Sequence, residues 1–221
     1  GAVVKELVEN AIDADAHRID VTITGGGRVA ITVVDDGFGM AADELSLAVQ
    51  RHATSKLRSD DLLNISTLGF RGEALPSIGS VSRLTLTSRP KGAHSAWLLR
   101  VEGGRVGEPE PAAHPPGTRV EVRQLFYATP ARLKFLKTDR TEFAYAVDSV
   151  KRLALAYPQI IFTIYDGARV VFRSIGRDEH FSRSRLERLG ELWGADFKEN
   201  AICIEAQRDM SVLTGYAALP T

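Results

Sequence analysis

Val3-Val4-Lys5-Glu6-Leu7-Val8-Glu9-Asn10-Ala11-Ile12-Asp13-Ala14-Asp15 is the stretch around which the rest of the chain is organised. Its apolar residues recur at helical spacing and form one stripe, which consists of Val4, Leu7, Val8, Ala11 and Ile12. At about 100° per residue, Glu6, Asn10 and Asp13 fall together on a narrow polar face beside that stripe. A surface helix usually turns such a face to water, so its interpretation depends on the stretches that follow.

Two later stretches indicate that this polar face takes part in chemistry. The stretch VVDDGFGM (33–40) places two acids and two glycines at the end of an apolar strand, and LGFRGEAL (68–75) places glycines just before another predicted helix. Glycines at a helix start leave backbone N–H groups free to bind an anion. The motif G-x-x-x-x-G-K-[ST] occurs nowhere in the chain, which excludes a P-loop site.

Together these stretches resemble the ATP-binding motifs of the GHKL clan, which includes gyrase B subunits, heat-shock chaperones, histidine kinases and MutL proteins. The sequences of these motifs are most similar to those of the MutL family of DNA mismatch repair proteins. Its hallmarks stand here as KELVENAIDA (5–14), DDGFGM (35–40), RHATSK (51–56), GFRGEAL (69–75), GTRVEV (117–122) and LFYATPARLKFL (125–136). The resemblance runs nearly end to end, and GFRGEAL with LFYATPAR is far more specific than a glycine pattern alone.

The resemblance implies an α+β fold: a GHKL, or Bergerat-type, ATPase sandwich of a mixed, largely antiparallel sheet with helices on one face. The start of an α/β domain similar to ribosomal protein S5 domain 2 is expected to follow. We place the first domain at residues 1–177 and the second, truncated one at 178–221. The chain begins inside a helical pattern without methionine and stops after a strand-like run. We interpret it as a fragment of a longer protein that lacks its N-terminal segment.

The hydrophobic pattern predicts the order of the elements. Two hairpins are expected, one around Gly25-Gly26-Gly27 and one around Asp166-Gly167. Further helices are predicted near 42–52, from Glu73, at 139–156 and at 182–193, and further strands near 82–88, 95–101, 117–125, 201–205 and 210–217. Residues 53–72 lack strong periodicity and are interpreted as a functional loop or lid. The Pro-rich segment 109–116 is interpreted as a surface loop.

The resemblance assigns the general base of ATP hydrolysis to Glu6 rather than to Glu9. A carboxylate that orients a water and takes its proton contributes typically 10²–10⁴-fold to such a reaction, and Glu9 points about 60° away from the Glu6–Asn10 face. Asn10 lies one turn further on and is the implied Mg²⁺ ligand, since magnesium takes hard oxygen ligands and few of them from protein. The alternatives are a solvated Glu6 and an Asn10 that satisfies neighbouring backbone. Asp13 shares the face as a possible support.

The acids and glycines of residues 35–40 suit the recognition of a base. Asp35 ends a strand, where its carboxylate can accept a hydrogen bond from an amine, and the resemblance assigns it to adenine, with Asp36 as a solvated neighbour. Gly37 and Gly39 lack a Cβ, so backbone can approach the base closely. Residues 37–42 also satisfy the dinucleotide pattern G-x-G-x-x-A, but a hairpin precedes them rather than a βαβ unit, and two acids would repel a pyrophosphate.

The remaining nucleotide contacts are implied by the resemblance for the lid, for the start of the helix near Glu73, and for a residue beside the adenine contact. They are Thr54, Lys56, Gly69, Phe70, Arg71, Gly72, Glu73, Ala74 and Thr118. The expected cofactors are therefore ATP and Mg²⁺.

Bulk composition limits the partners. The 28 basic and 28 acidic residues cancel, so any DNA contact has to come from local patches. Two basic runs are candidates, although solvated helix faces explain them as well; they are Arg132, Lys134, Lys137 and Arg140, and Arg183, Arg185 and Arg188. The single cysteine, Cys203, lies in an apolar run and is expected to be a buried, inert thiol in a reducing cytoplasm. No signal peptide or membrane-spanning stretch is visible, so no membrane contact is expected.

The resemblance implies a mismatch repair protein in which Mg²⁺-dependent ATP binding and slow hydrolysis gate dimerisation and the engagement of DNA. The implied partners are a second copy of the protein, a mismatch-recognition protein and downstream repair enzymes, in the cytoplasm and on the nucleoid during repair. Two alternatives stay open: a GHKL sensor histidine kinase, which would lack GFRGEAL and LFYATPAR, and an ATP-binding scaffold without hydrolysis. Asp15 stands where the family motif usually has glycine.

Overall fold

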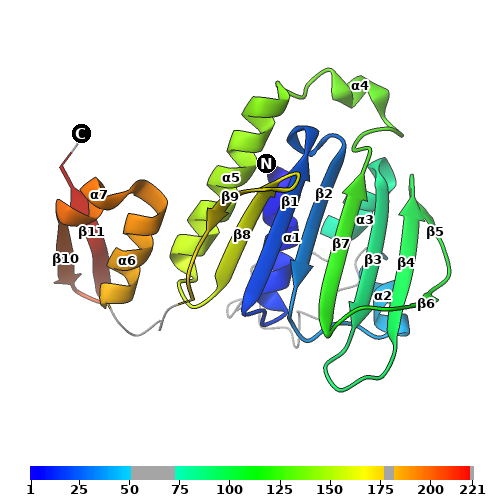
Figure 1. Cartoon of the computed structure of the whole chain (residues 1–221), viewed down its shortest axis with the longest axis horizontal. Coiled ribbons are helices and arrows are strands. Elements are labelled where there is room, and N and C mark those ends of the chain that lie inside the picture. The colour runs from blue at the N-terminus through cyan, green and yellow to red at the C-terminus, as the bar shows by residue number, and fades with distance from the viewer. Residues whose placement is uncertain (51–72, 177–181, 220–221) are drawn as a thin grey trace.

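The computed structural model describes residues 1–50, 73–176 and 182–219. Within these residues, nine strands form one sheet in the order β5-β4-β3-β7-β2-β1-β8-β9, with β6 paired to β4. Among the described strands, β1 (Arg18–Thr24) and β8 (Ile161–Asp166) form the parallel pair, and the other neighbours in this sheet are antiparallel. The expected mixed, largely antiparallel sheet is confirmed (Figure 1).

Most predicted strands form close to where the alternation places them. They are β2 (Ala30–Asp35), β3 (Arg83–Arg89), β4 (Ala96–Glu102), β7 (Gly117–Arg123) and β9 (Arg169–Arg173). Two short edge strands were not predicted, β5 (Arg105–Val106) and β6 (Glu110–Ala112). The interpretation of 109–116 as a loop throughout is therefore wrong, because β6 pairs with β4. An edge strand tolerates proline, since one of its sides lacks a ladder partner.

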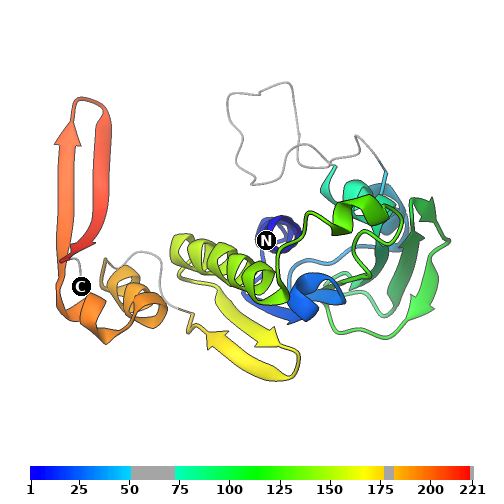
Figure 2. The same ribbon diagram turned by 90° about the horizontal axis from the view of Figure 1, so that it is seen from above.

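Helices cover one face of the sheet, as expected (Figure 2). This layer contains α1 (Ala2–Asp13), α3 (Ala74–Val81) and α5 (Asp139–Ala156). α1 lies centrally and contacts α5, α3 and β2. A shorter helix, α2 (Ala42–Ala48), replaces the predicted one over 42–52, and the short helix α4 (Pro130–Leu133) precedes α5.

The core lies between the helices and the inner face of the sheet. Alternate residues of the central strands are buried there, for example Val21 on β1 and Val33 on β2, which face each other in the ladder. The stripe of α1 packs on this face: Val4, Leu7, Val8 and Ala11 are buried. Because each buried Val or Leu side chain contributes about 1.5–3 kcal/mol, this packing fixes α1 at a defined position over the sheet.

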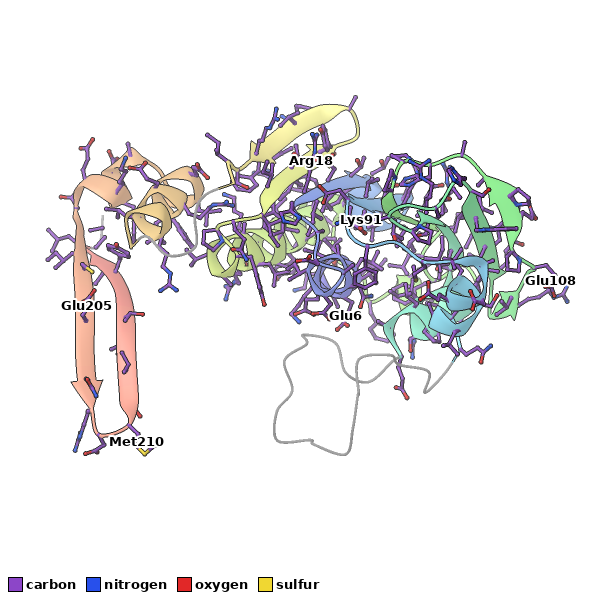
Figure 3. All side chains as sticks on the ribbon, turned by 90° about the horizontal axis from the view of Figure 1, so that it is seen from below. Glu6, Arg18, Lys91, Glu108, Glu205 and Met210 are labelled. Carbon is purple, nitrogen blue, oxygen red and sulfur yellow. The ribbon has the colours of Figure 1, made fainter. Side chains whose placement is uncertain are left out.

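A second, smaller part follows β9. It consists of α6 (Ser182–Trp193), α7 (Ala195–Glu199) and an antiparallel pair of β10 (Ala201–Arg208) and β11 (Ser211–Ala218). α6 contacts α5. Figure 3 shows Met210 at the tip of this hairpin, and nearly all its residues are exposed. The expectation of a buried Cys203 is wrong, because this side chain is exposed on β10.

Candidate functional site

Three polar side chains form a row at one end of the inner face of the sheet. The register pairs Asp35 of β2 with Thr118 of β7, and Thr118 with Ser88 of β3. Residues directly opposite each other on neighbouring strands point to the same side of a sheet. Each of the three strands is apolar and buried on this face up to that row, where all three side chains are polar and still buried. We call Asp35, Thr118 and Ser88 the polar row.

Ser88 links the polar row to its surroundings. Its Oγ lies 2.8 Å from Thr118 Oγ1 and donates to the carbonyl oxygen of Gly117 at 3.0 Å. The backbone N–H of Met40 donates to the same Oγ at 2.8 Å. Ser88 was not among the sequence candidates, because it stands in an ordinary strand, Arg83–Arg89, without a motif. Only its register position opposite Thr118 reveals it.

Burial disfavours the charged form of the Asp35 carboxyl group. Its side chain is 8% exposed, and the Gly37 N–H donates to Oδ1 at 2.9 Å. Burial raises the pKa of the Asp35 carboxyl to about 6, against the lowering effect of hydrogen bonds from the backbone of Gly37 and Thr118, while the charge of Asp36 raises it further. The charge of Lys91 lowers this pKa as well, but less than burial raises it. A buried carboxyl with a strongly shifted pKa is a candidate for ligand binding.

The turn after β2 attaches the polar row to the end of α1. Asp36 is exposed, but its Oδ1 accepts from the backbone N–H groups of His17 and Arg18, each at 2.8 Å. The sequence predicted only a solvated neighbour of Asp35, whereas Asp36 also binds the backbone of β1 and the residue before it. The N–H of Phe38 donates to the carbonyl oxygen of Ala14 at 2.9 Å. These bonds hold the C-terminal end of α1 beside the carboxyl end of β2.

Packing within the protein itself requires glycine at two positions of this turn. A Cβ at Gly37 would lie 2.5 Å from the carbonyl oxygen of Ala14. Gly39 has a φ of +72°, and a Cβ there would lie 2.1 Å from the carbonyl oxygen of Arg89. From the sequence, both glycines were expected to allow the approach of a base, whereas the structure shows close approach of the chain's own backbone. The missing Cβ atoms thus allow the turn to pack closely against Ala14 and Arg89 beside Asp35.

α1 presents the two residues proposed for catalysis on one side. Glu6 is exposed, and Figure 3 shows it on the side of α1 that is turned away from the sheet. Asn10, one turn further on, is partly buried. Glu9 is buried and pairs with Lys5, with Nζ to Oε1 at 2.7 Å. The two glutamates therefore have different surroundings, in agreement with the helical wheel.

The other predicted contacts are only partly described. Glu73 is the N-cap residue of α3 and is exposed, and Ala74 is the first residue of that helix. Thr54, Lys56 and residues 69–72 lie outside the described residues. The structure thus brings Asp35, the two glycines and Thr118 together at one end of the sheet, beside the helix that carries Glu6 and Asn10.

The two basic runs differ in the structure. The first is exposed around the start of α5, with all of its members at the surface: Arg132, Lys134, Lys137 and Arg140. In the second, Arg185 is exposed, but Arg188 is fully buried, and its Nη2 donates to the carbonyl oxygens of Pro158, Ile160 and Ile175. Arg188 therefore does not form part of a DNA-facing patch, since its guanidinium is committed to the protein backbone.

Comparison with known proteins shows which family has a sequence like that of this chain. A family described as histidine kinase-, DNA gyrase B-, and HSP90-like ATPase matches residues 1–110. The DNA mismatch repair protein MutL of Rhodospirillum rubrum is 67% identical over 218 residues, which cover 99% of this chain and 35% of that protein. The MutL protein of Paramagnetospirillum magneticum is 60% identical over 218 residues, or 99% of this chain and 36% of that protein. The chain belongs to the MutL family.

Solved structures agree with this family at the level of the fold. The Aquifex aeolicus MutL ATPase domain complexed with ADP superimposes with a TM-score of 0.73 at 29% identity, over 93% of this chain and 71% of that one. A second structure of that ATPase domain gives 0.71 at 28% identity, over 99% and 72%. The chain thus has the GHKL fold of MutL ATPase domains, and it spans about a third of the length of the curated MutL relatives it matches.

Proposed function

We propose that the chain binds ATP at the polar row and hydrolyses it slowly with Mg²⁺, as the nucleotide switch of a MutL-type mismatch repair protein. The observation that carries the proposal is Asp35, a buried carboxylate whose pKa is raised to about 6 at the end of the inner face. Such a carboxylate costs stability, and a ligand amine that donates to it offsets this cost. The related Aquifex aeolicus domain was solved in complex with ADP, which supports a purine nucleotide as the ligand.

The base is read by Asp35 and Thr118. One Asp35 oxygen accepts from the Gly37 N–H, which holds the carboxylate in one orientation, and its remaining lone pairs serve the adenine amine. Hydrogen bonds to a charged acceptor contribute about 1.5–3 kcal/mol. Gly37 and Gly39 belong to this part of the site because they allow the turn to pack against α1 and β3.

Glu6 and Asn10 serve the terminal phosphate. Glu6 acts as the general base: it accepts a proton from water as the water oxygen bonds to the γ-phosphorus and the ADP oxygen leaves. Asn10 fits a Mg²⁺ ligand, because its partly buried amide offers one hard oxygen on the same side of α1, and Mg²⁺ takes most other ligands from phosphates and water. When bound, the ion neutralises charge that develops on the phosphate oxygens.

The phosphates are further held at the start of α3 and in the lid. Glu73 and Ala74 begin α3, and the N-terminus of a helix favours an anion. The proposed lid contacts are Thr54, Lys56, Gly69, Phe70, Arg71 and Gly72.

The activity of the whole protein is proposed by analogy with the family. We expect nucleotide binding to gate dimerisation with a second copy, and the dimer to engage DNA, a mismatch-recognition protein and downstream repair enzymes. The exposed basic residues around the start of α5 are the proposed contacts to DNA phosphates. The domain boundary is placed at 177/178, where the second, S5 domain 2-like part begins. Within the described residues, no helix is long and apolar enough to cross a membrane.

Isothermal titration with a non-hydrolysable ATP analogue and Mg²⁺ tests the proposal. We expect one saturable site per chain that Asp35→Ala abolishes, and no heat of binding for the wild type would contradict it. A nucleotide-binding scaffold without hydrolysis is the second candidate, favoured by the exposure of Glu6. Single-turnover release of phosphate separates the two, because the scaffold would bind the analogue equally well and release none.

A further inference from the structure

Ser88 is the most connected side chain of the polar row, and the count of its hydrogens fixes the direction of each bond. A serine hydroxyl has one hydrogen to donate and two lone pairs to accept with. The Met40 N–H can only donate to it, and the Gly117 carbonyl oxygen can only accept from it. In the arrangement that makes all three contacts hydrogen bonds, the single hydrogen of Ser88 goes to Gly117.

In that arrangement the hydrogen bond between Ser88 and Thr118 has one direction. The two hydroxyl oxygens are 2.8 Å apart, and Ser88 has no second hydrogen, so Thr118 donates to Ser88. Thr118 has no hydrogen left for any other partner. Its Oγ1 presents lone pairs only, next to a carboxylate that also presents lone pairs only.

We propose that Ser88 sets the base specificity of the site, by taking the hydroxyl hydrogen of Thr118 so that Thr118 and Asp35 both act solely as acceptors. This inference rests on the proposed nucleotide binding. A purine with an amine at position 6 has two hydrogens for two acceptors, whereas a carbonyl oxygen at that position meets lone pairs at both. Ser88 is a positioning residue, since it acts through Thr118.

The row is rigid enough for this role. Ser88 is completely buried and Thr118 is 6% exposed. Thr118 lies opposite both Asp35 and Ser88 in the ladders of β2, β7 and β3, which are neighbours in the sheet (Figure 1). Thr118 lies on β7 between β2 and β3, and turning its hydroxyl hydrogen away from Ser88 would break the 2.8 Å contact between the two oxygens.

Titration of the purified chain with ADP and with inosine diphosphate, in the presence of Mg²⁺, tests the inference. Inosine diphosphate carries a carbonyl where ADP carries the 6-amine. A site built to pair a substrate group rejects the analogue lacking it strongly, so the wild type is expected to prefer ADP by about 100-fold or more. In Ser88→Ala the Thr118 hydroxyl is free to rotate and donate to the carbonyl, and the preference falls by about tenfold.

Three further variants separate specificity from stability. Thr118→Val removes the hydroxyl and lowers the preference, and adding Ser88→Ala in that background changes it no further, because Ser88 acts through Thr118. Ser82→Ala is the matched control: Ser82 is also completely buried, and its Oγ donates to the Ile78 carbonyl oxygen at 2.7 Å beside the other end of β3. This control lowers the melting temperature and leaves the preference unchanged.

The outcomes are distinguishable. If Ser88→Ala weakens ADP and inosine diphosphate by the same factor while the wild type binds ADP, this inference is wrong and the proposed function stands. If the wild type binds neither nucleotide, both are wrong. Should Ser88→Ala fail to fold, Ser88→Cys preserves the volume with a weak acceptor and is expected to lower the preference in the same direction.

Discussion

Among single residues, Asp35 lowers the stability of the folded chain at neutral pH while serving as the proposed contact to the base. Burial raises the pKa of its carboxyl to about 6 in the folded chain, against an ordinary value of 3.8. The folded state therefore binds the proton more tightly, so the contribution of Asp35 to stability is fully present below pH 3.8 and is lost as pH rises through 6. Two pKa units correspond to about 3 kcal/mol, which is a large fraction of the stability of a domain.

Asp35→Asn removes this charge without changing the shape of the side chain. At pH 7.5 we expect the free energy of unfolding to rise by about 1–3 kcal/mol, and the gain to shrink as pH falls through 6. Nucleotide affinity falls by at least about tenfold, because an amide offers one acceptor oxygen in place of two. Urea unfolding at several pH values and titration with ADP measure both effects.

Asp36→Asn is the matched control for this change. Asp36 accepts from two backbone N–H groups at the surface, so its neutralisation weakens charge-assisted bonds and lowers stability at pH 7.5. A stability gain for Asp35→Asn that grows toward acid pH would show that burial does not penalise the Asp35 charge.

Glu6→Gln tests the assignment of the general base. The amide cannot take a proton from water, so hydrolysis is expected to fall by about 10²-fold or more while nucleotide binding persists. The measurement is single-turnover phosphate release beside a binding titration. Glu9→Gln separates the two glutamates of α1: it weakens the Lys5–Glu9 pair and leaves the hydrolysis rate of the folded chain close to that of the wild type. Equal losses in both variants would argue against Glu6 as the specific base.

At the scale of elements, the turn between β2 and α2 determines the geometry of the site. Gly39 has a φ of +72° and its Cβ position lies 2.1 Å from the carbonyl oxygen of Arg89, whereas Gly92 has a φ of +82° and open space around it. A residue with a Cβ would strain the backbone at either position, but only at Gly39 would its Cβ also clash with another strand.

Gly39→Ala is expected to lower the free energy of unfolding by at least about 3 kcal/mol, because the turn has to move off β3. Gly92→Ala is expected to cost about 1–2 kcal/mol, the price of a left-handed backbone for a residue with a Cβ. Chemical denaturation measures both. Similar losses in the two variants would mean that the close approach to Arg89 does not constrain the turn.

Elements with strong periodicity could be predicted from sequence, and elements that depend on tertiary pairing could not. The stripe of α1 and the alternation on both sides of Gly25-Gly26-Gly27 carry their own signal, and the structure confirms the helix and the hairpin. β6 contains a proline and forms only because β4 offers an edge. Ser88 was missed for a related reason, since strand register is a property of three strands and leaves no mark in one of them.

At the scale of the whole molecule, Arg188 joins the two parts of the chain. It lies on α6, and its guanidinium donates to Pro158 and Ile160 before β8 and to Ile175 after β9, at 2.6, 3.1 and 2.8 Å. The basic run around it suggested an exposed face, because sequence alone does not show which member of a run turns inward.

Arg188→Leu leaves these carbonyl oxygens without their donor, and we expect the free energy of unfolding of the second part to fall by about 2 kcal/mol or more. Trp193 at the end of α6 and Trp97 on β4 report the two parts separately in single-tryptophan versions of the chain. Their urea transitions are expected to separate in the variant. Arg185→Leu, at an exposed position on the same helix, changes little, and coincident transitions in Arg188→Leu would remove Arg188 from this role.

The most direct test of the central claim is a crystal structure of the chain with a non-hydrolysable ATP analogue and Mg²⁺. We predict that the 6-amino group of the base lies within hydrogen-bond distance of the Asp35 carboxylate, and that the terminal phosphate lies beside Glu6 and Asn10 of α1. A nucleotide bound elsewhere, with the polar row unoccupied, would contradict the account.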